Sequence, residues 1–180
     1  MRFLRLILTG LIVLLFSGVL TPVTFASAAD TSGLAYEAYN VIYPYSPPAR
    51  STTMYTQCDS GTVPTIDRNF GSGGIFNCRN DYVMVHYHGF ISFPTDRTVT
   101  FRAYADDGFY LSINNTTVIN DWYLKGCNSG QAGTFTFAAN QWYPVDAWFF
   151  EWGGAACSTL RYQDASTFNV VPTERFSQTG

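Results

Sequence analysis

Apolar residues recur at every second position through much of this chain after residue 30, and helical spacing is scarce. In the segment TVTFRAYA (98–105), one face of an extended strand carries Val99, Phe101, Ala103 and Ala105. A period of two is typical of a strand with one buried face. Because no long amphipathic segment with helical spacing follows residue 30, the sequence predicts an all-β protein.

Other segments repeat this pattern. Segments 81–93 and 141–152 predict longer strands, and residues 109–120 predict a hairpin around Asn114 and Asn115. Asparagine tolerates the left-handed backbone of a tight turn. We therefore expect an antiparallel β-sandwich or a closed, barrel-like pair of sheets with long surface loops.

Residues 44–78 lack this alternation, with prolines early and a glycine cluster late. A structureless loop of this length is uncommon in a compact domain. We expect the segment to cross the surface with short strand pieces, held by Cys58 and Cys78.

The first residues have the pattern of a secretory signal. Residues 1–28 begin with basic side chains, continue through an apolar run at 6–20 and end in Ala-Ser-Ala. A membrane anchor, the rival interpretation, needs roughly 20 continuous apolar residues. We therefore expect a signal peptide over 1–28 and an exported domain over 29–180, secreted or at the cell surface, with no membrane insertion after cleavage.

The charge balance limits the partners. Residues 1–28 hold two of the 10 basic residues and none of the 13 acidic ones, so the rest has 8 against 13, a net charge of −5. Nucleic acids and anionic membranes are bound largely through clustered Lys and Arg. Neither is the expected partner, and the sequence does not indicate an oligomeric state.

The cysteines predict two disulfides. The four cysteines are widely spaced and form no CxxC motif: Cys58, Cys78, Cys127 and Cys157. In an exported protein this spacing favours disulfides over a zinc site. Of three possible pairings we favour Cys58 with Cys78 and Cys127 with Cys157. Each would contribute about 3 to 4 kcal/mol on the chain-entropy model.

Two adjacent acids, Asp106 and Asp107, precede Gly108 in a chain otherwise poor in charge. One interpretation is a turn in which the aspartates accept backbone N–H groups. The other is a cation site, because neighbouring carboxylates repel each other unless a cation lies between them. Calcium favours such oxygen ligands on irregular loops.

Four blocks in order carry a family resemblance, with Asp106-Asp107-Gly108 and the later Asp121-Trp122 as the most specific elements. The blocks are GLAYEAYN, VHYHGFISFPTDRTVTFRAYADDGFYLSINNTTVINDW, AGTFTFAANQWYPVDAWFFEWGGAACSTLRY and FNVVPTERF. In this order the sequence resembles the PA14 domain. The resemblance covers nearly all of residues 29–180 and implies a β-sandwich of exported adhesins, glycosidases and toxins, usually a carbohydrate-recognition or interaction module.

The resemblance also implies a site. In yeast adhesins of this family a cis peptide joins adjacent aspartates that hold a calcium ion in contact with sugar hydroxyls, and the matching positions are Asp106 and Asp107. A further asparagine ligand matches Glu151, which is a departure from the family pattern. Glutamate still ligates calcium, so the expected metal ligands are Asp106, Asp107 and Glu151. Sugar rings pack on aromatic faces, and Tyr123 and Trp152 are the candidates, with Asp106 and Asp107 at the sugar hydroxyls.

The remaining candidates are weaker. Trp122 and Trp148 are expected in the core. His86 and His88 share one face of a strand, a spacing that can ligate zinc or copper, yet the sequence identifies no third ligand, and a packed or solvent-facing pair is favoured.

We expect no enzyme, because the sequence lacks a serine elbow, HExxH and a phosphate loop. A glycosidase pair of Asp107 and Glu151 is the weak exception. Two functions remain: a calcium-dependent carbohydrate-binding module for adhesion or glycan recognition, and a non-catalytic structural or interaction module that binds a cell-surface protein without sugar or calcium.

Overall fold

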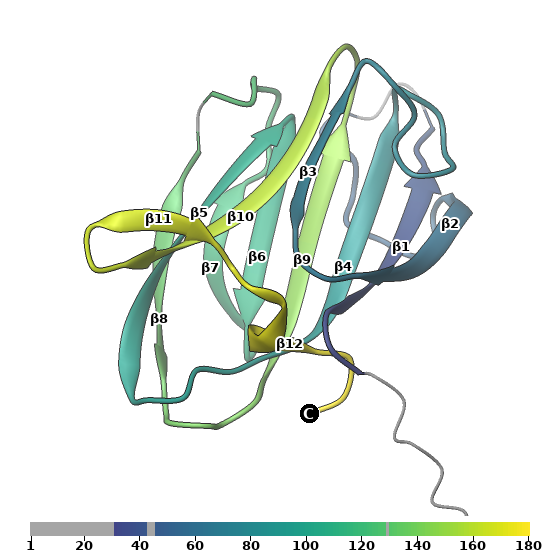
Figure 1. Ribbon diagram of the computed structural model, residues 1–180. Coiled ribbons are helices and arrows are strands. Elements are labelled where there is room, and N and C mark those ends of the chain that lie inside the picture. Colours follow the sequence, from purple (N-terminus) through teal and green to yellow (C-terminus); the bar gives the residue numbers. More distant parts are fainter. Residues whose placement is uncertain (1–30, 43–45, 129) are drawn as a thin grey trace, which may run out of the picture.

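The computed structural model describes residues 31–42, 46–128 and 130–180, so the predicted signal peptide lies outside the described residues. Two antiparallel sheets pack face to face (Figure 1). The fold is therefore the all-β sandwich that the alternating sequence predicts. Among the described residues no helix has the length and apolar character needed to cross a membrane.

The strands have the following bounds: β1 (Leu34–Asn40), β2 (Thr56–Val63), β3 (Asp67–Gly71), β4 (Val83–Ile91), β5 (Arg97–Asp106), β6 (Gly108–Ile113), β7 (Thr116–Asp121), β8 (Ala132–Phe137), β9 (Tyr143–Glu151), β10 (Ala156–Asp164), β11 (Thr167–Val170) and β12 (Phe176–Ser177). The seven-stranded sheet has the order β2-β1-β4-β9-β6-β7, with β12 beside β4. The five-stranded sheet has the order β11-β10-β5-β8, with β3 beside β10. A short 3-10 turn, η1 (Thr173–Arg175), precedes β12.

The main core lies between the two sheets. On β5 the predicted inward face, Val99, Phe101, Ala103 and Ala105, is fully buried. It packs with the inward residues of the larger sheet, such as Phe149 on β9, in one continuous cluster. Burial of each large apolar side chain stabilises the fold by about 1.5 to 3 kcal/mol.

The predicted hairpin is confirmed. β6 and β7 pair in antiparallel register on either side of Asn114 and Asn115. These asparagines have φ of 50° and 60°, the left-handed region that asparagine tolerates better than most residues.

Segment 44–78, in its described part, contains β2 and β3 and runs along the surface as expected. β2 has mostly exposed side chains because it is the edge strand of the larger sheet, which explains why its sequence lacks alternation. A disulfide joins Cys58 on β2 to Cys78, with the Cα atoms 5.4 Å apart, and confirms that pairing.

A second apolar cluster lies on the outer face of the larger sheet, where sequence reasoning expected none. It contains Tyr39, Val41, Tyr55, Met84, Trp148 and Phe150. Trp148 is buried as predicted, but in this cluster, and Trp122 is only partly buried against it. The Trp122 indole N–H donates to the carbonyl of Pro48 at 2.8 Å, which fixes the segment before β2 over this face.

Candidate functional site: an acidic cluster at one end of the sandwich

The adjacent aspartates lie where the chain passes from one sheet to the other. Asp106 is the last residue of β5 in the smaller sheet, and Gly108 is the first of β6 in the larger sheet. The Asp106-Asp107 peptide bond is cis, as the resemblance implies. At Gly108 a Cβ atom would lie 2.1 Å from the Phe150 ring. Glycine therefore follows the acids because no side chain fits there.

Asp107 is fixed by two backbone groups from different loops. Its Oδ1 accepts from the N–H of Lys125 at 3.1 Å, and its Oδ2 accepts from the N–H of Trp152 at 2.8 Å. The side chain is 8% exposed. This carboxylate thus joins the loop after β7 to the loop after β9.

Glu151, the last residue of β9, has no exposed surface, and neither of its carboxylate oxygens has a hydrogen-bond partner of normal geometry among the described residues. One ligand oxygen each from Asp106, Asp107 and Glu151 lies within 4.8 Å of the others. The three predicted metal ligands are therefore brought together. A buried carboxylate without partners carries a large desolvation penalty unless a proton or cation neutralises it.

The electrostatics of the cluster agree with this geometry. Burial, followed by the charges of Asp107 and Asp106, raises the pKa of Glu151 to about 8 against a smaller opposing effect of the Gly153 amide. Burial also raises the pKa of Asp107, opposed by its two backbone donors. Burial and the Asp107 charge raise the pKa of Asp106. Each carboxyl therefore gains from a neutralising partner.

Sequence reasoning missed a basic residue beside the acids. The Lys125 ammonium lies 3.3 Å from Asp121 Oδ2 and donates to the Ala105 carbonyl at 2.7 Å, with its side chain 5% exposed. Its charge offsets part of the rise in the pKa of both Asp106 and Asp107. The i,i+4 spacing of Asp121 and Lys125 was the available sequence signal. That spacing indicates an ion pair only on a helix, and the sequence predicts no helix here.

Asp81 is a second residue that sequence reasoning missed. It accepts from the Gly154 N–H at 3.1 Å and adds to the rise in the pKa of Glu151. Asp81 precedes β4 and no motif surrounds it, so its proximity follows only from the pairing of β4 with β9.

The donor set fits calcium. Calcium binds oxygen ligands at 2.3–2.6 Å, so ligands across one ion lie up to about 5 Å apart, and the oxygens here meet that limit. The cluster contains neither histidine nor cysteine, the donors that zinc and copper favour. Asp106, Asp107 and Glu151 would hold the ion.

The surface beside the cluster presents apolar side chains. Tyr123 and Leu124, in the loop after β7, are 48% and 51% exposed. Trp152 is only partly exposed because its ring packs edge-on against Tyr82 at 5.0 Å. Of the two aromatic candidates, Tyr123 presents more of its ring to solvent. Leu124 was not predicted.

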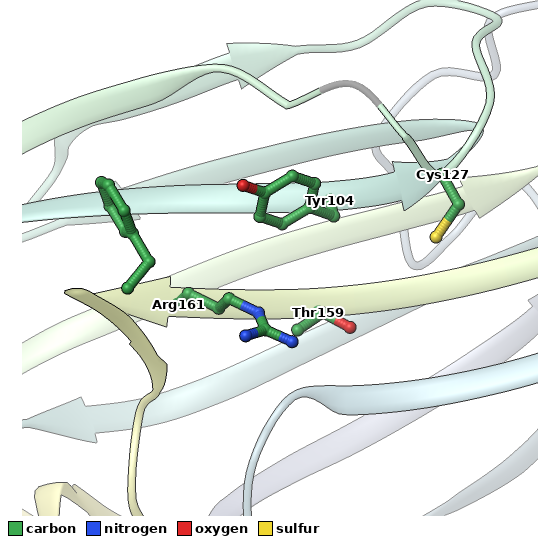
Figure 2. A pocket seen from close by; sticks show the side chains of 5 residues that line it. Tyr104, Cys127, Thr159 and Arg161 are labelled. Carbon is green, nitrogen blue, oxygen red and sulfur yellow. The ribbon is translucent and has the colours of Figure 1, made fainter. Parts of the chain in front are cut away.

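The second disulfide, Cys127 to Cys157, ties the loop after β7 to β10 next to the acids, which confirms the predicted pairing. Cys157 pairs with Asp106 in the sheet register. Cys127 also borders an open hollow of about 360 Å³, and Figure 2 shows the side chains around it. It is lined by Tyr104, Cys127, Thr159, Arg161 and Phe168. Tyr104 lies two residues before Asp106 on β5, and none of the three acids is among the residues that line the hollow.

His86 and His88 belong to a different part of the molecule. They share the outer face of β4, as predicted, with ring centroids 4.9 Å apart, and the His86 ring stacks on Trp148 at 3.9 Å. They are thus partly packed, in the middle of the larger sheet.

The fold and the site define an antiparallel β-sandwich module with an acidic cluster where the chain crosses between its two sheets. The PA14 domain family matches residues 31–164, and the chain belongs to this family. No curated protein matches the sequence.

Solved structures agree with the fold. An anti-sigma factor domain-containing protein from Clostridium clariflavum superposes with a TM-score of 0.67 at 22% identity, over 83% of this chain and 47% of that chain. A PA14 sugar-binding domain from an RTX adhesin gives 0.67 at 18% identity, over 82% and 98%. The epithelial adhesin 6 A domain from Candida glabrata, in complex with Galβ1-3GlcNAc, gives 0.62 at 13% identity, over 84% and 88%. The chain spans about half the length of the first two structures it matches, 48% and 47%.

Proposed function

We propose that this chain is an exported, calcium-dependent carbohydrate-binding module that acts in adhesion or glycan recognition. The single observation that carries the proposal is the buried carboxylate of Glu151 beside Asp106 and Asp107, which has no hydrogen-bond partner of normal geometry among the described residues. A cation between three clustered acids relieves their mutual repulsion, and a calcium ion at a loop cluster keeps coordination positions for outside oxygens. A PA14 domain described as sugar-binding and an adhesin domain bound to Galβ1-3GlcNAc share the fold.

Within this proposal the residues have distinct roles. Asp106, Asp107 and Glu151 hold the ion, and Asp106 and Asp107 also approach the sugar hydroxyls. Tyr123 offers an exposed ring against the apolar face of a sugar, and Trp152 contributes the edge that Tyr82 leaves uncovered. Two disulfides and the signal-like residues 1–28 support export to an oxidising compartment, either secreted or on the cell surface.

We propose a binding rather than a catalytic role. Glycosidases place two carboxyl groups about 5 to 9.5 Å apart on either side of a bond that both must reach. Glu151 has no exposed surface. A substrate would therefore not reach the second acid.

The alternative function is a structural or protein-interaction module without sugar or calcium. The exposed Tyr123 and Leu124 favour it, because adjacent apolar side chains on a fixed loop also suit a protein surface. In this case Lys125 and a proton on Glu151 neutralise the acids, and the partner is a cell-surface protein.

A glycan array with residues 29–180 separates the two functions. We expect glycan binding in calcium that is lost in chelator and in Asp107→Ala. Asp164→Asn is the matched control, since Asp164 is exposed at the far end of β10. Calcium-independent glycan binding, or equal binding by Asp107→Ala, would refute the metal role. Binding to a surface protein that Asp107→Ala retains would favour the alternative.

A further inference from the structure

The outer face of the larger sheet brings both histidines of the chain next to a carboxylate. β1 and β4 pair so that Glu37 lies directly opposite His86, and His88 follows two residues later on the same face. One donor atom each from Glu37, His86 and His88 lies within 4.8 Å of the others. Strand pairing thus supplies the third ligand that the sequence did not identify.

Asp146 and Trp148 on β9 fix the orientation of the His86 ring. The Trp148 indole N–H donates to both oxygens of Asp146 at 3.1 Å, so Asp146 acts as an acceptor. His86 Nε2 lies 2.5 Å from Asp146 Oδ1 and must therefore carry the proton in that bond. The other nitrogen, Nδ1, then has a free lone pair in the neutral ring.

The Nδ1 atom of His86 lies near the carboxylate of Glu37, but no hydrogen bond joins the two groups. His86 Nδ1 is buried, has no hydrogen-bond partner among the described residues, and lies 3.8 Å from Glu37 Oε2. The same Glu37 oxygen accepts from the Tyr39 hydroxyl at 2.6 Å. Two electron-rich atoms face each other here, an arrangement that a cation between them would stabilise.

We propose that Glu37, His86 and His88 bind a divalent transition-metal ion, zinc or copper. Two imidazoles with one carboxylate are a donor set that suits these ions, whereas calcium takes oxygen ligands and disfavours imidazole nitrogen. The hydrogen bonds that His86 donates to Asp146 and that Tyr39 donates to Glu37 are the outer contacts that typically orient metal ligands. Three protein ligands leave a fourth position for water or an outside ligand.

This site is independent of the acidic cluster. Asp146 and Trp148 face outward on β9, whereas Glu151, at the end of the same strand, belongs to the inward series with Val145 and Phe149. At about 3.3 Å per residue, Asp146 and Glu151 are roughly 16 Å apart along the strand. An experiment can therefore refute one of the two proposed ion sites without refuting the other.

Calorimetric titration of tag-free protein with zinc tests the proposal. We expect one ion per chain, an affinity at least about tenfold lower in His88→Ala and Glu37→Gln, and about 10 to 100-fold lower in Asp146→Asn. His88 is the sharpest probe because His86 also packs on Trp148, and thermal unfolding verifies that each variant folds. Asp164→Asn, exposed at the far end of β10 and outside both clusters, is the control and should bind zinc as the wild type does. Absence of binding at millimolar zinc, or equal affinity in His88→Ala, would overturn the proposal.

Copper(II) provides a second, local measurement. A copper ion at His86 would quench the fluorescence of the stacked Trp148, so Trp148→Phe, which keeps an aromatic ring there, should lose most of the quenching. Nitrogen-15 spectra of the two histidines should shift on addition of zinc. If His86 instead carries protons on both nitrogens at neutral pH and its signals ignore zinc, a proton occupies the proposed metal position and the inference is wrong.

Discussion

Replacement of Glu151 by glutamine tests whether a buried charge is the reason for cation binding. The pKa of Glu151 rises from 4.5 in the unfolded chain to about 8 in the folded one, so the native state holds more protons between these values. Without metal, the stability contributed by the protonated group is present below the unfolded pKa and is lost as pH rises through the folded pKa.

The magnitude follows from linkage. Between about pH 5 and about pH 7 the wild type should lose on the order of 2 kcal/mol in chelator, after allowance for screening by solvent and Lys125. For a domain of this size that loss corresponds to a fall in Tm of about 4 to 8 °C. Glu151→Gln has no proton to lose there, so its Tm should fall less over the same range.

The assay is thermal unfolding of wild type and variant across this pH range, in chelator and in calcium. Burial lowers the pKa of His88, which makes stability rise with pH, but this effect is common to both proteins and cancels in their difference. A calcium concentration of 100 times the wild-type Kd at pH 7 should raise wild-type stability there by about 2.7 kcal/mol. The same concentration should stabilise the wild type less at pH 5, and should stabilise the variant less than the wild type at pH 7. Glu174→Gln, an exposed glutamate, is the matched control. Parallel pH profiles of wild type and Glu151→Gln in chelator would refute the reasoning.

Three further predictions concern the surroundings of the cluster. Gly108→Ala should destabilise the fold by about 1 to 3 kcal/mol, because the new methyl group collides with the buried Phe150 ring; urea unfolding measures it, and wild-type stability would contradict the contact. Removal of both Cys127 and Cys157 should lower stability by about 2 to 5 kcal/mol and weaken calcium binding in calorimetry, because the loop that holds Asp107 loses its tether; unchanged calcium affinity would show that the loop is fixed without the disulfide. Tyr123→Ala should reduce glycan binding while the calcium-dependent rise in Tm stays at the wild-type value, and a full glycan affinity in this variant would remove Tyr123 from the sugar contact.

Much of the fold is predictable from the sequence because a sandwich core imposes a period of two. The inward face of β5 and the β6–β7 hairpin follow directly from residues 98–105 and from Asn114 and Asn115. The edge strand β2 gives no such signal, because both of its faces are largely exposed. The second cluster around Trp148 also has no distinct sequence signal. An apolar residue such as Trp148 is predicted to be buried, but the sequence does not show whether it is buried between the sheets or on the outer face of one of them.

The candidate site is only partly predictable for a different reason. Asp106 and Asp107 are adjacent, and their position in the family pattern identifies them. Lys125 and Asp81 come near them only through loop geometry and the pairing of β4 with β9. Contacts of this kind have no local sequence period, so a single sequence does not contain a pattern that reveals them.

The register between β4 and β9 determines both candidate cation sites. It places Glu151 opposite Val83 and His88 opposite Asp146. On β9, Glu151 therefore faces inward at the end of the strand, and Asp146, which accepts the His86 hydrogen bond, faces outward near its middle. A slip of one residue would exchange the two faces, exposing Glu151 and moving Asp146 away from His86. Because the inward residues Val145, Ala147 and Phe149 are fully or almost fully buried, their burial opposes such a slip. The same apolar packing that stabilises the sandwich therefore holds the ligands of both sites in place.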